Sequence, residues 1–163
     1  MIRIEPITSV NAVLFRDIRL RALQDSPTAF GSTYAREACF DDAEWARRVE
    51  HWSGDKGIGF LALEDREACG LAGALLESCN QAQLVSMWTA PESRQRGAGR
   101  MLVDAVAAWA VMRGVQLLRL MVTSSNEPAM RFYDRLGFTR TGRTEPYPND
   151  TALFEWEMAR RLD

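Results

Sequence analysis

The amino-acid sequence predicts one mixed α/β domain over residues 1–163, with a mostly antiparallel central sheet of about seven strands flanked by about four helices. The length suits a single domain, and a 47% share of apolar residues is enough to form a substantial core. Short apolar or alternating runs alternate with runs whose apolar residues recur at helical spacing. The expected order is strand, two helices, three strands, helix, strand, helix and two strands.

The expected strands are runs of apolar, β-branched or alternating residues bounded by turn residues. They cover residues 2–6, 58–63, 68–77, 84–89, 117–122, 138–142 and 152–158. The run 117–122 is largely apolar, which predicts a strand covered on both faces. Charged residues at 64–67 join two of the strands as a hairpin, and a proline-held loop at 145–150 precedes the last strand.

The expected helices start at capping residues and stop at glycine or before proline. Thr8 or Ser9 caps the first helix, and the second begins at residues 41–44, where acidic side chains favour a helix N-terminus. The third follows a glycine-rich segment, and Ser125 or Asn126 caps the fourth. The predicted buried positions are Val10, Val13, Leu14, Ile18 and Leu23 in the first helix, Trp45, Val49 and Trp52 in the second, and Leu102, Val106, Trp109 and Ala110 in the third.

The glycine-rich segment Ser93–Arg100 joins a strand to a helix and contains two glycines and three arginines. Glycine lets the backbone approach a ligand closely, and a helix N-terminus presents unpaired N–H groups to an anion. The segment therefore predicts a diphosphate site. A P-loop is excluded because no Lys-Ser or Lys-Thr follows the glycines, and a dinucleotide fingerprint would need Gly or Ala where Leu102 lies.

Two motifs in this chain resemble those of the GNAT superfamily of acyl-CoA N-acyltransferases. Arg94-x-x-Gly97-x-Gly99 is similar to the family's [QR]-x-x-G-x-[GA] motif. Residues 126–138, Asn-Glu-Pro-Ala-Met-Arg-Phe-Tyr-Asp-Arg-Leu-Gly-Phe, are similar to its N-x-x-A-x-x-[FL]-Y-x-x-x-G-F motif. The resemblance extends over roughly residues 58–144, and the order of the elements is similar to the GNAT fold. It implies an N-acetyltransferase with acetyl-CoA as co-substrate.

The resemblance also implies which residues bind acetyl-CoA. The diphosphate would lie on main-chain N–H groups of the glycine-rich segment, and the pantetheine arm would pair with the edge of the preceding strand. The expected cofactor-binding residues are Met87, Trp88, Thr89, Arg94, Gln95, Arg96, Gly97, Ala98, Gly99, Arg100, Asn126 and Tyr133. Taken by itself, the Trp88 side chain would be assigned to the core.

Tyr133 is the expected catalytic residue, as the general acid that protonates the leaving thiolate. The seven-residue spacing from Asn126 to Tyr133 places both on one face of a helix. In the family, the tyrosine at this place is the usual acid and the asparagine contacts the pantetheine arm. The alternative is that Tyr133 packs in the core with its helix neighbours. A buried phenol needs a hydrogen-bond partner, so both interpretations are compatible.

The general base is left open, because Met121 stands where many family members have a glutamate. Glu37, Glu145, Asp150, Glu155 or a chain of water molecules are the alternatives. Phe30, Gly31 and Ser32 follow the first helix, where family members commonly line the acceptor pocket. The alternative there is a plain loop with one buried aromatic ring.

Composition excludes several classes of function. A formal net charge of −2 argues against a nucleic-acid binder, and no apolar run is long enough to span a membrane. The three cysteines lack metal-ligand spacing and indicate reduced thiols in the cytoplasm, so no metal is expected. His51 is the sole histidine, and a helix-end position is its expected role. The expected partners are acetyl-CoA and an amine acceptor, with a homodimer left open.

The sequence thus predicts an acetyl-CoA-dependent N-acetyltransferase that acts by direct attack of a primary amine. The acceptor is a small molecule or a protein N-terminus. The alternative function is a non-catalytic module that binds acyl-CoA as a sensor or partner domain. The absence of a glutamate at Met121 favours that alternative, and an intact Tyr133 disfavours it.

Overall fold

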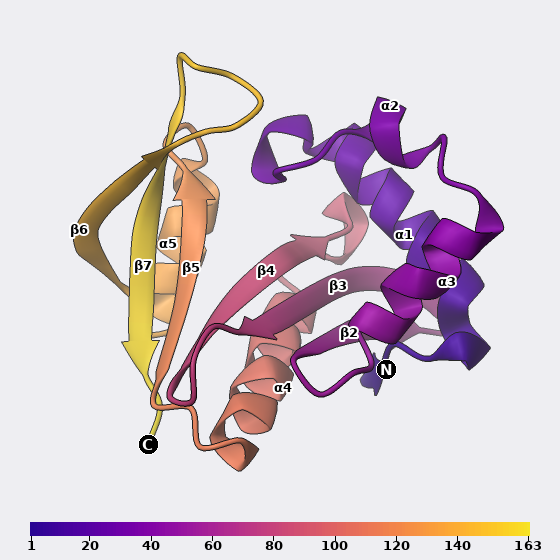
Figure 1. The fold of residues 1–163 in the computed structure, drawn as a ribbon, viewed down its shortest axis with the longest axis horizontal. Helices are drawn as coiled ribbons and strands as arrows, with labels where there is room; N and C mark the ends of the chain where they lie inside the picture. Colours follow the sequence, from indigo (N-terminus) through magenta and orange to yellow (C-terminus); the bar gives the residue numbers. More distant parts are fainter.

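The computed structural model describes residues 1–163 as a seven-stranded sheet with five α-helices, in the predicted order apart from one added helical turn, α2 (Figure 1). The strands are β1 (Ile2–Pro6), β2 (Gly57–Glu64), β3 (Glu67–Leu76), β4 (Gln81–Thr89), β5 (Leu117–Thr123), β6 (Thr139–Pro146) and β7 (Phe154–Arg161). The helices are α1 (Ala12–Asp25), α2 (Tyr34–Glu37), α3 (Asp42–His51), α4 (Ala98–Met112) and α5 (Glu127–Arg135). The predicted fold class is confirmed.

The sheet has the strand order β1-β2-β3-β4-β5-β7-β6, and only β4 and β5 are parallel neighbours. These two strands pair over a short stretch, from Gln81 opposite Leu117 to Leu84 opposite Leu120. Beyond it they diverge, as Figure 1 shows, so the sheet opens between the end of β4 and the end of β5. The edge of β4 from Val85 to Thr89 that faces β5 therefore has no strand partner.

Two hydrophobic cores lie on the two faces of the sheet. One packs α4 and α5 against the sheet and includes Leu102, Val106 and Phe138. The other packs α1 and α3 against the opposite face and includes Phe15, Trp45 and Leu71. The predicted buried faces of α3 and α4 are confirmed, because amphipathic helices on both faces of an open sheet must turn their apolar stripes inward.

The predicted apolar face of the first helix is partly wrong. Ser9–Asn11 forms a 3₁₀ turn, which Thr8 caps by accepting a hydrogen bond from the Val10 N–H at 3.2 Å. A 3₁₀ turn has about three residues per turn and so shifts the register of the first residues. Val10, within this turn, is 95% exposed, and Val13 is 61% exposed because it lies on the side of α1 opposite the buried face. The buried face consists of Phe15, Ile18, Arg19, Ala22 and Leu23.

The expectation that β5 is covered on both faces is also wrong. Leu118, Leu120 and Val122 are buried toward α4 and α5, whereas Leu117, Arg119 and Met121 are only half-buried. The N-terminal helices cover β2 to β4, so they leave the opposite face of β5, β7 and β6 without a helix (Figure 1). None of the helices combines the length and the hydropathy that a bilayer crossing requires.

Candidate functional site

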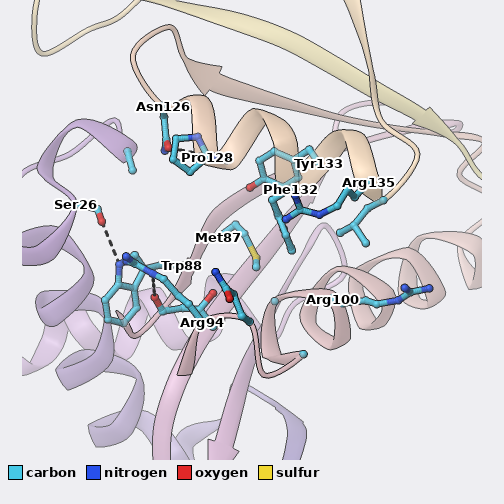
Figure 2. A pocket seen from close by; sticks show the side chains of 17 residues that line it. Ser26, Met87, Trp88, Arg94, Arg100, Asn126, Pro128, Phe132, Tyr133 and Arg135 are labelled. Atoms are coloured by element: carbon cyan, nitrogen blue, oxygen red, sulfur yellow. Dashed lines mark hydrogen bonds between the residues drawn. The ribbon is translucent and has the colours of Figure 1, made fainter. Parts of the chain in front are cut away.

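A cavity of about 590 Å³ lies where β4 and β5 diverge, between the start of α4 and the inner face of α5 (Figure 2). It is lined by Ser26, Ala29, Met87, Trp88, Thr89, Arg94, Gln95, Gly97, Gly99, Arg100, Asn126, Pro128, Ala129, Phe132, Tyr133, Arg135 and Leu136. Ten of the twelve predicted cofactor-binding residues therefore meet here. The exceptions are Arg96 and Ala98.

The loop before α4 presents main-chain donors to this cavity. Gln95 and Gly97 have positive φ angles of 65° and 93°, and Gly97 is the N-cap of α4 without a side-chain cap. None of the main-chain N–H groups from Gln95 to Arg100 donates a hydrogen bond within the protein. Successive free N–H groups in a left-handed turn at a helix N-terminus form a concave anion site.

Gly99 allows the start of α4 to lie close to α5. A Cβ atom on Gly99 would be 3.0 Å from Cζ of Phe132 and 3.2 Å from Cε of Met87, which is tighter than ordinary packing. Gly97 has open space around it and is required instead by its positive φ. The two glycines thus have different roles: one shapes the loop, and the other keeps the cavity narrow.

The arginines of the glycine-rich segment are not equivalent. Arg94 lines the cavity, but it donates to Asp25 at 2.8 Å and to the Thr89 carbonyl at 3.0 Å. Arg96 forms an ion pair with Glu64, with its Nη1 at 2.8 Å from Oε2, and does not line the cavity. The charge expected from Arg96 is therefore directed elsewhere.

Two other arginines leave their charge available to the cavity. Arg100 makes only a loose contact of 3.8 Å with Asp104, and Arg135 has no ion pair. Arg135 was not among the predicted site residues, although it lies on α5 three residues after Phe132 and so on the same helix face. Ala98, by contrast, is fully buried in the core, and only its main-chain N–H is available.

Trp88 is a core residue that is 4% exposed, and it also lines the cavity. Its indole N–H donates to Asp25 at 3.0 Å and to the Ser26 hydroxyl at 3.3 Å. Burial alone would raise the pKa of the Asp25 carboxyl, but hydrogen bonds from Ser26, Trp88 and Arg94 outweigh it and hold this pKa below its ordinary value. Asp25 thereby ties α1 to the end of β4.

Tyr133 and Asn126 face the cavity from α5. Asn126 caps α5 by accepting a hydrogen bond from the Ala129 N–H at 3.3 Å. The Tyr133 ring is buried between Phe132 and Phe138, with ring centroids at 5.2 and 5.7 Å. Its hydroxyl lines the cavity, points toward β4 in Figure 2, and has no hydrogen-bond partner in the protein. Burial raises the pKa of Tyr133, so the phenol stays protonated at neutral pH.

In the alternative interpretation of Tyr133, its neighbours Ala129, Phe132 and Leu136 on the same face of α5 would fill the core. Met130 and Tyr133 are buried, whereas Ala129, Phe132 and Leu136 are half-buried and line the cavity. The helix thus turns its apolar face partly to the core and partly to the cavity. Pro128, Ser26 and Ala29 also line it without having been predicted.

The predicted acceptor residues Phe30, Gly31 and Ser32 lie beside this cavity rather than in its wall. Tyr147 donates to the Phe30 carbonyl at 2.6 Å, and Asn149 donates to the Ser32 carbonyl at 3.4 Å. The segment after α1 is therefore joined to the loop between β6 and β7. Thr123, at the end of β5, also donates to the Thr28 carbonyl at 2.6 Å.

Comparison with known proteins identifies the family. The sequence profile of the acetyltransferase (GNAT) family matches residues 20–138. The chain belongs to this family. The resemblance inferred from the two motifs is confirmed, and so is the expectation of an acetyltransferase.

Several curated relatives are acetyltransferases. The aminoglycoside N(6′)-acetyltransferase type 1 of Salmonella typhimurium is 28% identical over 63% of this chain and 77% of its own length. The streptothricin acetyltransferase of Streptomyces lavendulae is 34% identical over 59% of this chain and 49% of its own.

Solved structures share the fold. A GNAT acetyltransferase from Streptococcus pneumoniae superposes over the full length of both chains with a TM-score of 0.84 at 16% identity. An aminoglycoside 6′-N-acetyltransferase in complex with coenzyme A superposes with a TM-score of 0.74 at 19% identity, over 99% of this chain and 97% of its own.

Proposed function

We propose that this GNAT protein transfers the acetyl group of acetyl-CoA to a primary amine of a small molecule or a protein N-terminus by direct attack. One observation carries the proposal. Unpartnered main-chain donors from Gln95 to Arg100 and the unpartnered Tyr133 hydroxyl border the same cavity. A diphosphate and a leaving thiolate need these two kinds of donor.

Different residues of the cavity would bind the cofactor and take part in the reaction. The free N–H groups at the start of α4 would hold the diphosphate, and the unpaired edge of β4 from Val85 to Thr89 would pair with the pantetheine amides as an added strand. Bound acetyl-CoA supplies the activated acetyl thioester. Tyr133 would donate its proton to the sulfur, whose free thiol has a pKa of about 8.5.

Among the alternatives for the general base, Glu155 fits best. Glu37 is fully buried and held by Arg19, and Asp150 accepts a hydrogen bond from the Ala152 N–H in a turn. Glu155 makes no ion pair and lies on β7 directly opposite Thr123. Burial, and next the charge of Glu145 on β6, raise the pKa of Glu155. A carboxylate with a raised pKa is a better proton acceptor for an ammonium group.

The function is tested by following thiol release from acetyl-CoA across a panel of amines that includes aminoglycosides, streptothricin-type compounds and alanine-terminated peptides. The proposal expects turnover with at least one amine well above the rate of hydrolysis. Tight binding of acetyl-CoA without turnover on any amine would instead support the alternative of a non-catalytic acyl-CoA-binding module.

Arg135 should strengthen cofactor binding through its charge. The change Arg135→Ala is expected to weaken the affinity for coenzyme A several-fold at low salt, and less at high salt, because an exposed charge is screened. Calorimetric titration at two ionic strengths measures both effects. Arg131→Ala is the matched control, since Arg131 is on the same helix, pairs with Glu127 at 3.7 Å and does not line the cavity. Equal losses in the two variants would contradict the role of Arg135.

Glu155 is tested through the pH dependence of the rate. A base acts only when ionised, so protonation of Glu155 below its raised pKa should slow the wild type as pH falls. In Glu155→Gln this acid limb should be lost, and the rate at neutral pH should fall about 10²- to 10⁴-fold. Because the amine also titrates, the ratio of the two rates is followed across pH. A ratio that stays near one across pH would exclude Glu155 as the base. The variant Glu145→Gln tests whether the charge of Glu145 contributes to the raised pKa of Glu155.

A further inference from the structure

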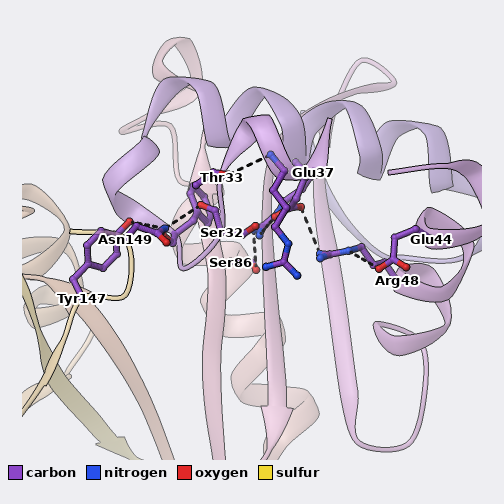
Figure 3. A network of polar contacts seen from close by, with 11 residues as sticks. Ser32, Thr33, Glu37, Glu44, Arg48, Ser86, Tyr147 and Asn149 are labelled. Atoms are coloured by element: carbon purple, nitrogen blue, oxygen red, sulfur yellow. Dashed lines mark hydrogen bonds and ion pairs between the residues drawn. The ribbon is translucent and has the colours of Figure 1, made fainter. Parts of the chain in front are cut away.

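A buried ion pair lies behind the end of β4 and is not used by any of the steps above. Arg19 of α1 donates from Nε and Nη2 to both carboxylate oxygens of Glu37, at 3.0 and 2.9 Å. Arg19 is 7% exposed and Glu37 is fully buried. Arg48 of α3 approaches the same carboxylate at 3.5 Å. Figure 3 shows this network between the N-terminal helices and the sheet.

The third contact of Arg19 is to the irregular part of β4. Its Nη1 donates to the Ser86 hydroxyl at 3.2 Å. Between β3 and β4, Leu71 lies opposite Trp88 and Gly73 opposite Val85, so Ser86 and Met87 together face Ala72 as a bulge. Ser86 has a φ of 56°, a left-handed conformation that side-chain-bearing residues rarely adopt. Met87, the next residue, lines the cavity.

This arrangement has features that stability alone does not require. An apolar cluster of similar volume stabilises a fold at least as well as a buried ion pair does. Glycine, which adopts positive φ without strain, would also suit position 86 better than serine. A hydroxyl that accepts from a fixed guanidinium defines where the bulge lies and how the main chain beyond it is turned. Strained backbone held by its surroundings is common next to functional sites.

We propose that Arg19 is a positioning residue for acetyl transfer: oriented by Glu37, it holds the bulge at Ser86 and thereby sets the main chain of Met87 and Trp88 toward the thioester. The inference rests on the proposed function, since it assigns the reacting end of acetyl-CoA to this part of β4. The same guanidinium lies over the Phe30 ring at 4.8 Å, so one side chain connects the bulge with the segment that joins α1 to α2.

The contact is tested by Ser86→Ala, which removes the hydroxyl and leaves the Arg19–Glu37 pair intact. The single-turnover rate is expected to fall roughly 10- to 100-fold, because a small misplacement of reacting groups has effects of that size. The affinity for coenzyme A, which depends on the diphosphate site, should stay unchanged. Ser53→Ala is the matched control, since that hydroxyl donates to the Val49 carbonyl away from the cavity and its loss should leave the rate unchanged.

Two further measurements keep the test decisive. Ser86→Gly adopts the same φ without strain, so it replaces the alanine variant if that variant unfolds, and it should show the same loss of rate. The ratio of affinities for acetyl-CoA and coenzyme A reports on the thioester contact even if no acceptor is found, and it should fall in both variants. Wild-type protein that lacks turnover contradicts the proposed function. Unchanged rate and unchanged affinity ratio in a folded Ser86 variant overturn the positioning role.

Discussion

Tyr133→Phe is expected to lower the single-turnover rate of acetyl transfer by about 10²- to 10⁴-fold, the range typical of general acid catalysis. The hydroxyl is the only group removed. The ring keeps its contacts with Phe132 and Phe138, and no hydrogen bond within the protein is lost, because the hydroxyl has no protein partner. The affinity for coenzyme A and the melting temperature should therefore stay close to those of the wild type.

The other two tyrosines make the comparison informative. Tyr34 is 40% exposed, so Tyr34→Phe should change neither rate nor stability. Tyr147 donates to the Phe30 and Pro27 carbonyls at 2.6 and 3.2 Å, so Tyr147→Phe should reduce the free energy of unfolding by about 1 kcal/mol. A full single-turnover rate in Tyr133→Phe would exclude the acid role. Loss of stability without loss of rate would assign Tyr133 to the core alone.

The order of the elements and most of the candidate site follow from local patterns in the sequence. Two contiguous motifs supply much of the site. One contains Gly97 and Gly99 at the start of α4, and the other contains Asn126 and Tyr133 at the cap and in the body of α5. Their meeting at one cavity follows from the fold, which the strand and helix order indicates. Contiguity explains why the main-chain part of the site was predictable.

Partners from distant segments explain what was not predictable. Arg94 and Arg96 carry the same charge in the sequence, but Asp25 and Glu64 lie 69 and 32 residues away from them along the chain. These ion pairs neutralise the charges of Arg94 and Arg96. Arg135 stands at a variable position of the second motif, lines the cavity and has no ion pair. The direction of an arginine side chain depends on such distant partners, which the local spacing of residues in the sequence does not indicate.

The predicted burial of the first helix and of β5 was partly wrong for a related reason. Periodicity predicts that a helix or strand has an apolar face, but not where a 3₁₀ turn shifts the register or which side of a sheet lacks a helix. Val10 is exposed for the first reason and Met121 is half-buried for the second. The Arg19–Glu37 pair was equally hidden, because a buried arginine on a helix has no signature in composition or spacing.

Glu37→Ala is expected to reduce the free energy of unfolding by about 3–5 kcal/mol, the usual effect of removing one partner from a buried ion pair. The variant leaves the Arg19 guanidinium buried at 7% exposure without its counter-ion. Chemical denaturation measures the loss. The control is Glu92→Ala, which removes an exposed pair with Arg21 and should change stability little. A stability of Glu37→Ala near that of the wild type would show that the pair is not a structural requirement.

The double variant Glu37→Ala with Arg19→Met separates the charge from the packing. It removes both charges and should recover part of the lost stability, whereas acetyl transfer should stay impaired, because the contact with Ser86 is absent.

The pH dependence of stability gives a second test of the ion pair. Burial alone would raise the pKa of Glu37, but the hydrogen bonds and charge of Arg19 hold it below its ordinary value. Its contribution to stability is therefore present above the unfolded-state pKa and is lost as pH falls through the lower folded-state value. The difference in unfolding free energy between the wild type and Glu37→Ala should narrow over that interval, and a difference independent of pH would contradict the assignment of this stabilisation to the ionised carboxylate.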